Sequence, residues 1–463
     1  MNNVLFRKLA FIGVIMALLI IPLMMISGKI TERDAFRVEA KNNVSLSWAR
    51  SQKLMGPILV IPYSHQIQRS VSSPKTNELI TRTIRLEKSL FILPESTEIN
   101  SHIDTDTRYK GIYKIPVYTT QINVKGVFSK ASIHHAMDQV QDTVESVSFE
   151  KAYLTTTISD PRGINTIPTL HWQAEERPFK PGSKLTNQNN GIHALVGSLE
   201  DLNTDQINFD FQIELRGTEQ LSFIPSGKET QVQITSPWPH PQFTGSFLPH
   251  SRTIDSNGYQ AHWKISSFAS NISSNAQRCE QGDCLALFAS EFGVKHINPV
   301  DVYLQSERSV KYGFLFIALS FVTFFIFEII QKLSIHPIQY SLMGLAIALF
   351  YLLLVSLSEH IGFAKAYGIA AISCVSLLFY YLRFILNGLK QASAFCALLL
   401  LLYAILYIII SAEDFAFLMG GVLTFLTLSI VMITTRNIDW YQIGLQADDK
   451  KQQDLRNNTA PGE

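Results

Sequence analysis

The residues best suited to chemistry in this 463-residue chain are two cysteines, Cys279 and Cys284, which enclose the sequence Glu-Gln-Gly-Asp. In an oxidising compartment, two cysteines at this spacing with a glycine between them can form a disulfide. A metal site needs further cysteine or histidine ligands at matching spacing, and the neighbouring sequence supplies none. We expect a structural disulfide, with reduced thiols or a metal pair as the alternatives.

Sequence motifs give little support for metal binding or catalysis elsewhere in the chain. We find no HExxH or GxSxG motif and no glycine-rich nucleotide-binding loop. Histidines are scattered through the polar part of the chain, and we interpret them as solvated or hydrogen-bonded residues; among them are His171, His240, His250, His262 and His296. We therefore assign no catalytic, cofactor-binding or metal-binding residue, and we expect a protein that is not an enzyme.

Glu328 is a candidate site residue because it follows the apolar sequence Phe-Phe-Ile-Phe, and charge is costly in hydrocarbon. Lys332 lies four residues later, in the order that favours a helical ion pair. Both side chains can extend toward the membrane interface. The sequence predicts such a pair, and a functional role for Glu328 is the alternative.

Glu359 and His360 form a second polar group, at the end of another apolar segment. A carboxylate beside an imidazole can sense pH or relay protons. The simpler interpretation is a polar helix end that meets water. With Glu328, these residues make up our candidate polar site at the membrane interface. No Asp, Glu, Lys or Arg occupies the middle of any apolar segment, which weighs against an ion-coupled transporter.

Long apolar segments at both ends of the chain must position these residues. One runs from Leu9 to Ile26. The length of each segment is close to that of a helix that crosses a bilayer, which needs about 20 residues. About five more are expected at 313–330, 339–356, 366–383, 394–410 and 415–434. We divide the chain into an N-terminal transmembrane anchor (1–30), an amphipathic or linker helix (31–55), a β-rich domain (56–310), a transmembrane bundle (311–436) and a tail (437–463).

The basic residues predict which side of the membrane each part faces. Excess Lys and Arg near helix ends marks the cytoplasm, and Arg7 and Lys8 precede the first segment. Later loops that alternation assigns to the same side carry Lys332, Arg383 and Lys390. We expect both termini inside and the large domain outside. The first segment also resembles a cleaved signal peptide ending near Ser27, but its apolar core is long and no A-x-A sequence follows.

The middle of the chain alternates between apolar and polar residues, with Gly, Pro, Asn and Ser between the runs. This period of two predicts an antiparallel, β-sandwich-like domain. Candidate strands are 56–63, 81–86, 109–118, 121–128, 152–158, 207–215, 231–235 and 259–265. The net charge is only +1, from 39 basic and 38 acidic residues, which gives no overall field to attract nucleic acid. The expected partner is the lipid bilayer, because the apolar segments are long enough to cross it.

Several motifs, in order and spacing over nearly the whole chain, resemble the CreD family of inner-membrane proteins. They are Trp48, Gly56-Pro-Ile-Leu-Val-Ile-Pro-Tyr63, Tyr109-Lys-Gly-Ile-Tyr-Lys-Ile-Pro-Val-Tyr118, Phe324-Phe-Ile-Phe-Glu328, His336-Pro-Ile-Gln-Tyr340 and the segment from Ala348 to Gly362. The resemblance implies a role in envelope integrity of Gram-negative bacteria. It also implies links to colicin tolerance and to a two-component regulatory system, and it supplies no catalytic residues.

Three functions are compatible with these observations. The first is a non-catalytic envelope protein whose periplasmic β domain binds or braces an envelope protein or cell-wall component. The second is handling or transport of a lipid or cell-wall intermediate, because five clustered spans exceed what anchoring requires. The third is a periplasmic hydrolase, for which the sequence offers only unassigned serines and carboxylates. We favour the first function, because a claim of activity needs evidence from a site.

Overall fold

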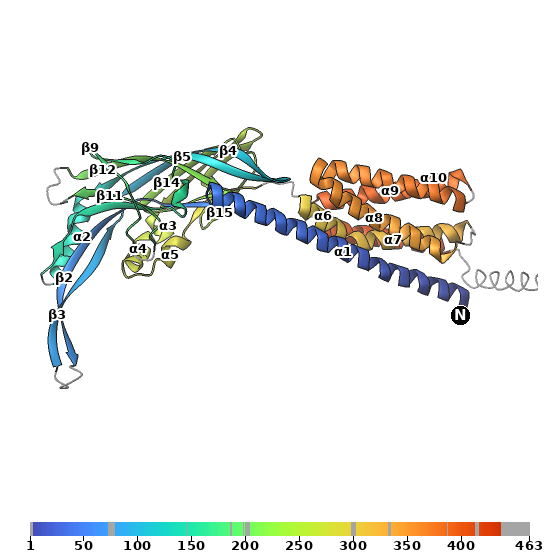
Figure 1. Ribbon diagram of the computed structural model, residues 1–463, viewed down its shortest axis with the longest axis horizontal. Coiled ribbons are helices and arrows are strands. Elements are labelled where there is room, and N and C mark those ends of the chain that lie inside the picture. Colours follow the sequence, from blue (N-terminus) through green and yellow to red (C-terminus); the bar gives the residue numbers. More distant parts are fainter. Residues whose placement is uncertain are drawn as a thin grey trace, which may run out of the picture. The chain divides into compact units, whose positions relative to one another are not determined.

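The computed structural model describes residues 3–72, 79–144, 146–185, 188–197, 199, 204–297, 302–331, 335–386, 388–412 and 416–436. It contains two compact units (Figure 1). A helical unit combines Met1–Val38 with Val300–Glu463, and a sheet unit comprises Glu39–Pro299.

The helical unit contains most of the helices that are long and apolar enough to cross a membrane. Its elements are α1 (Asn3–Trp48), which continues into the sheet unit, α6 (Val302–Lys311), α7 (Gly313–Ile330), α8 (Pro337–Ile361), α9 (Phe363–Ile385), α10 (Leu389–Ser411) and α11 (Ala416–Thr435). Within the described residues, six helices, namely α1 and α7 to α11, meet the length and composition of a membrane span. The prediction of an N-terminal apolar helix followed by a cluster of about five is confirmed.

The helix α1 is continuous across the point where the sequence suggested a new helix start at Thr31. It contains Pro22 and ends at Trp48, and the first strand follows at Gln52. The expected tail, 437–463, lies outside the described residues.

Local sequence signals set the ends of α8. His336 accepts a hydrogen bond from the backbone N–H of Ile338, and Gln339 accepts one from the backbone N–H of His336, which forms a capping box. Pro337 occupies the first turn, where its missing N–H has no cost. Gly362 ends the helix with φ of +81°, a conformation that a side chain disfavours.

Close helix packing in this unit depends on Gly344 of α8. A Cβ atom at this position would collide with Leu19 of α1 and with the ring of Phe321 in α7. Small residues permit such an approach, which matters because lipid supplies no hydrophobic drive between helices. Substitution of Gly344 by a larger residue would therefore push α8 away from α1 and α7.

In its described residues, the sheet unit has three sheets, four short α-helices and one 3-10 turn. The eight-stranded sheet has the order β16 (Ser251–Asp255), β17 (Gly258–Ser266), β14 (Glu229–Ser236), β4 (Ser96–Lys110), β5 (Tyr113–Ser129), β12 (Gln206–Thr218), β8 (Thr169–Trp172) and β9 (Glu175–Pro178). The six-stranded sheet contains β10 (Lys180–Pro181), β11 (Gly191–Gly197), β7 (Ala152–Thr157), β2 (Ile58–Ser72) and β3 (Leu79–Ile92), with β6 (Ser148–Phe149) paired to β2.

The four-stranded sheet has the order β1 (Gln52–Met55), β13 (Gln220–Ile224), β18 (Phe292–His296) and β15 (Pro241–Gly245). Of the paired strands described, β1 with β13 and β14 with β4 are parallel, and the other pairs are antiparallel. The short helices are α2 (Lys130–Thr143), the 3-10 turn η1 (Pro161–Gly163), α3 (Ser267–Ser270), α4 (Ile272–Glu280) and α5 (Leu285–Ala289).

Alternating side chains from all three sheets meet in one hydrophobic core. In β12, the buried residues are Ile207, Phe209, Phe211, Ile213 and Leu215, and the residues between them face outward. Each fully buried side chain of this size stabilises the fold by about 1.5–3 kcal/mol relative to an exposed one. The central, mostly antiparallel sheet domain that the period-two pattern predicts is confirmed.

Candidate functional site

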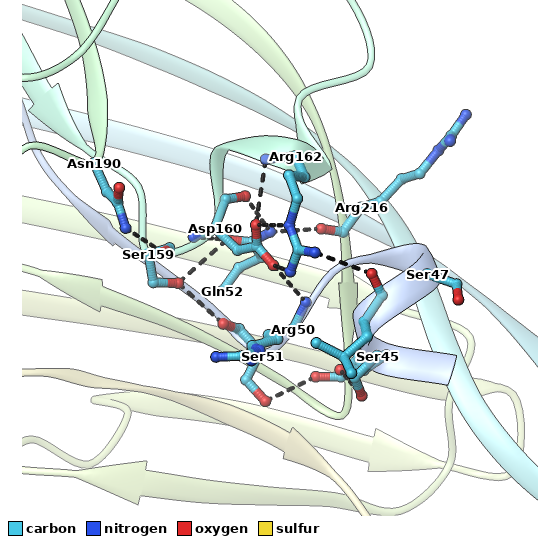
Figure 2. Close-up of polar contacts among 12 residues, drawn as sticks. Ser45, Ser47, Arg50, Ser51, Gln52, Ser159, Asp160, Arg162, Asn190 and Arg216 are labelled. Carbon is cyan, nitrogen blue, oxygen red and sulfur yellow. Dashed lines mark hydrogen bonds and ion pairs between the residues drawn. The ribbon is translucent and has the colours of Figure 1, made fainter. Parts of the chain in front are cut away.

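The C-terminal end of α1 is fixed to the sheet unit by an aspartate and an arginine two residues apart (Figure 2). Arg162 donates from Nε and Nη2 to the carboxylate of Asp160, at 2.8 and 2.6 Å. Its Nη1 donates to the backbone carbonyl of Leu46 at 3.0 Å. The last carbonyls of a helix lack partners within the helix, and a cation is favourable there. Arg162 therefore supplies a hydrogen-bond donor to a carbonyl in the last turn of α1.

The side-chain amide of Gln52 completes this arrangement, which we call the polar clamp (Gln52, Asp160 and Arg162). Its Nε2 donates to the carbonyls of Asp160 and Arg216, at 3.0 and 2.8 Å. Its Oε1 accepts from the backbone N–H of Asp160 at 3.2 Å. Gln52 is buried, so these bonds replace the water that its amide loses.

Asp160 is kept charged by the clamp. The guanidinium of Arg162 holds the pKa of this carboxyl below its usual value, burial opposes the shift, and the backbone N–H of Arg50 adds to it. Asp160 also accepts from the N–H of Arg162 and so begins the turn η1. Both carboxylate oxygens have internal partners, so the arrangement fixes backbone positions and offers no free nucleophile.

Serines extend the clamp toward neighbouring strands, as Figure 2 shows. Ser159 donates to the carbonyl of Ser51 at 3.0 Å and accepts from the N–H of Lys53. Ser51 donates to the carbonyl of Thr218, also at 3.0 Å. The residues that follow α1 are thus bonded to both the loop before η1 and the end of β12.

Trp48, the last residue of α1, is enclosed by two arginines. The guanidinium carbons of Arg108 and Arg216 lie 4.6 and 4.9 Å from the centroid of its ring, within the range of cation–π attraction. Its indole N–H donates to the carbonyl of Tyr118 at 3.4 Å. A hollow of about 660 Å³ lies beside it and is lined by the last turns of α1 with Arg108 and Lys110.

Glu328 occupies a buried polar position near the end of α7, with a partner that the sequence did not indicate. Lys8 of α1 pairs with it and also donates to the carbonyl of Ile335 at 3.0 Å. Tyr340 donates to Glu328 Oε2 at 2.7 Å, and the N–H of Ile335 donates to Oε1 at 2.9 Å. The expected partner, Lys332, lies outside the described residues.

Glu359 accepts a hydrogen bond from Tyr303 at 3.1 Å and lies 3.8 Å from Nε of Arg33, while His360 is exposed. The structure does not bring this group together with Glu328. Tyr340, which contacts Glu328, precedes Glu359 by 19 residues of α8, roughly 28 Å along a helix. The two candidate groups therefore lie about one bilayer core apart.

Cys279 and Cys284 form the disulfide that the sequence predicts. It joins the end of α4 to the start of α5 within a small buried cluster that includes Ile272 and Leu287. The other two cysteines, Cys374 and Cys396, are buried in α9 and α10.

The histidines do not form a metal site in the part of the chain that the structure describes, where no group of three or more His, Cys, Asp or Glu could hold an ion. His296 is buried, and its Nε2 lies 3.1 Å from the hydroxyl of Tyr259. Burial lowers the pKa of His296 to about 4. His296 is therefore an uncharged core residue at neutral pH.

Sequence reasoning missed the polar clamp and the role of Lys8. The available signal was Ser159-Asp-Pro-Arg162, because Asp followed by Pro favours the start of a turn. That signal predicts a turn. It does not predict the hydrogen-bond partners of the turn, Gln52 and Leu46, which lie more than a hundred residues away in the chain.

In the part of the chain that the structure describes, six apolar helices and a large, mostly antiparallel sheet unit define a multi-pass membrane protein with a sizeable sheet domain. The family model described as Inner membrane protein CreD matches residues 4–441. The Inner membrane protein CreD of Escherichia coli (strain K12) is 31% identical over 449 residues, which cover 96% of each chain. This chain belongs to the CreD family of inner membrane proteins.

Among solved structures, an M1 zinc metallopeptidase from Deinococcus radiodurans is similar over 37% of this chain and 38% of its own. The identity is 6% and the TM-score is 0.16, so the likeness carries no argument about function.

Proposed function

We propose that this protein is a non-catalytic envelope-integrity protein, whose periplasmic sheet domain binds or braces an envelope protein or cell-wall component. The observation that carries the proposal is the polar clamp. A domain that acts on a partner through a membrane helix needs a firm attachment to that helix. The clamp provides one. Arg162 bonds the end of α1 to η1, and Gln52 of β1, just after the helix, bonds to the loop before η1 and to β12.

The family context supports the same function and extends it. Resemblance to the CreD family links the protein to tolerance of certain colicins and to two-component envelope-stress regulation. The basic residues Arg7 and Lys8 before the first span favour cytoplasmic termini and a periplasmic sheet domain.

The clamp can be tested by complementing a strain that lacks the gene with an Arg162→Ala variant. We expect colicin tolerance and envelope integrity to fall to the level of the deletion strain, because the end of α1 loses its carbonyl partner and Asp160 loses its cation. Arg177→Ala is a matched control, since Arg177 also pairs with an acid two residues earlier, Glu175, whose side chain is exposed, whereas that of Asp160 is buried. Full tolerance with Arg162→Ala, at normal protein levels by immunoblot, would refute the role of the clamp.

The side of the membrane can be tested independently with one engineered cysteine. Asp255 lies in an exposed strand, whereas Cys279 and Cys284 are bonded and the other two cysteines are buried. We expect an impermeant maleimide to label Asp255→Cys in cells whose outer membrane is permeabilised. Labelling only after lysis would place the sheet domain in the cytoplasm.

Handling or transport of a lipid or cell-wall intermediate is the alternative function, and the polar group around Glu328 is the observation that favours it. Glu328 and Tyr340 are buried in the helical unit, where ionisable residues often mark a pathway. If Glu328→Gln abolishes tolerance while the protein keeps its unfolding temperature, this alternative gains support. If colicin tolerance is unchanged in the Glu328→Gln variant, the result favours the function in which the sheet domain binds or braces an envelope component.

A further inference from the structure

Four side-chain amides stand in one row across four neighbouring strands of the eight-stranded sheet. Gln233 of β14 is paired with Asn100 of β4, Asn100 with Asn123 of β5, and Asn123 with Gln212 of β12. We call these four residues the amide row. Residues paired directly across strands point to the same face of a sheet.

The amide row lies on the outer face. Each of its residues is partly or fully exposed. The residues next to them in the four strands are buried in the core: Val232, Ile99, Val124 and Ile213. Alternation along each strand therefore presents the amides to solvent.

The sheet is hollowed along this row. Asn100, Asn123 and Gln212 line a depression of about 750 Å³, and Gln212 also lines a second one of about 360 Å³. The two depressions share His171 as well, so they are continuous along the face. A groove rather than a closed pocket suits a chain-like ligand.

Acidic side chains outnumber basic ones in the groove, because Glu98, Asp210 and Glu214 line it with one lysine, Lys125. Lys125 lies 3.4 Å from Glu98, and Glu98 also accepts from the amide of Asn100 at 2.9 Å. A polyanion such as nucleic acid needs an excess of Lys and Arg, which this groove does not offer. The acidic excess disfavours a polyanion, and the amide side chains favour an uncharged ligand that can hydrogen-bond to them.

Amide side chains suit hydroxyl groups because each carries both a hydrogen-bond donor and an acceptor. Neighbouring strands are about 4.8 Å apart, so the amides repeat at close to the length of one sugar ring in an extended polysaccharide. A strand of linked sugars lying across the four strands would meet a new amide at each ring.

We propose that the amide row binds a strand of uncharged, hydroxyl-rich polysaccharide laid across β14, β4, β5 and β12. The inference rests on the proposed function, because it names the chemistry of the envelope component that the sheet domain contacts. Asn123 and Gln212 carry the centre of the site, being the exposed members of the row that line the larger depression.

The experiment is a titration of the full-length protein in lipid nanodiscs with two neutral β-linked hexasaccharides, one of glucose and one of N-acetylglucosamine. We expect calorimetric binding of at least one. The double variant Asn123→Ala with Gln212→Ala should bind about tenfold more weakly or worse, since each lost hydrogen bond lowers affinity several-fold.

Two controls keep the titration decisive. Gln66→Ala with Gln68→Ala removes two exposed amides from β2, in the six-stranded sheet, and should leave binding unchanged. If the double alanine variant does not fold, as judged by thermal unfolding, Asn123→Asp with Gln212→Glu keeps the shape and removes the amide donors, and it should weaken binding similarly.

The proposal is overturned if neither hexasaccharide binds, or if loss of the two central amides leaves the affinity unchanged. Salt-sensitive binding of heparin in place of the neutral sugars would also overturn it. Failure here is distinguishable from failure of the proposed function, which is measured by the tolerance of cells carrying Arg162→Ala.

Discussion

Two buried carboxylates, Asp160 in the sheet unit and Glu328 in the helical unit, are stabilised in different ways. Their side chains are 9% and 6% exposed. The cation for Asp160 comes from Arg162, two residues later, whereas the cation for Glu328 comes from Lys8, 320 residues earlier. The first pair stabilises the turn η1, which bonds to the end of α1 through Arg162. The second pair joins α1 to α7.

The cations differ in their access to water. The side chain of Arg162 is 54% exposed, and that of Lys8 is 21% exposed. When a cation is removed from a solvent-accessible site, water can solvate the carboxylate that remains. When it is removed from a buried site, the carboxylate is left without solvation. The helical unit should therefore be more sensitive than the sheet unit to the loss of one partner of its buried ion pair.

The largest expected effect is that of Lys8→Met, which leaves Glu328 buried without its cation. We expect a loss of about 3–5 kcal/mol of stability, seen as a lower thermal unfolding temperature in detergent. The double variant Lys8→Met with Glu328→Gln should recover most of it, because no unpaired charge remains.

Lys29→Met is the matched control in the same helix. Lys29 pairs with Glu32 at an exposed position, so its loss should change stability by less than about 0.5 kcal/mol. Equal effects of the two lysine variants would contradict the assignment of Lys8 to a dry site.

The next largest effect on stability is expected from loss of the disulfide between Cys279 and Cys284. Cys279→Ser with Cys284→Ser should lower stability by about 2 kcal/mol, because the bond closes a short loop in the unfolded chain. Reducing agent should act similarly on the native protein. Mass spectrometry without reduction should find no free thiol at either position, and alkylation of both would contradict the bond.

A smaller effect is expected for Asp160→Asn, which should lower the stability of the fold by about 1.5 kcal/mol at neutral pH. The substitution weakens the charge-assisted hydrogen bonds from Arg162. The pKa of Asp160 is lowered in the fold, so its contribution is present above the unfolded pKa and is lost as pH falls through the folded value. The native protein should therefore lose stability below about pH 4 more steeply than the variant.

Unfolding temperatures measured between pH 7 and pH 3 test this difference. Asp104→Asn, at an exposed carboxylate of the same unit, serves as control and should keep the native slope. Parallel pH profiles for the native protein and Asp160→Asn would show that the clamp does not depend on charge.

The smallest effect is expected for Glu359→Gln. Arg33 is 50% exposed and 3.8 Å away, so the ion pair contributes less than about 1 kcal/mol. The amide can still accept from Tyr303. Envelope tolerance should stay nearly intact, and a loss as severe as gene deletion would make Glu359 an active participant.

The elements of this fold could be predicted because their signals are local. The span expected at 313–330 matches α7, and the alternation of 207–215 matches the buried and exposed residues of β12. The disulfide was predictable for the same reason, since its two cysteines are five residues apart. Hydrophobic period and turn chemistry determine such features within a few residues.

The polar sites could be predicted only in part, because their partners are set by tertiary packing. Glu328 was recognised as a costly charge, but Lys8 meets it only after α1 packs beside α7 and α8. Gln52 carries no sequence signal, since a glutamine at the start of a strand is ordinary until its neighbours are known. The amide row likewise emerges only from the register of four strands.

The close approach of Gly344 to Leu19 bears on how the chain matures. Trimming by a leader peptidase after residue 28 would strip away Leu19 together with Lys8. The remaining helices would carry an open furrow along α7 and α8, and Glu328 would lose its counter-ion. The first apolar helix therefore supplies packing surface for α8 and the counter-ion of Glu328, in addition to its apolar length.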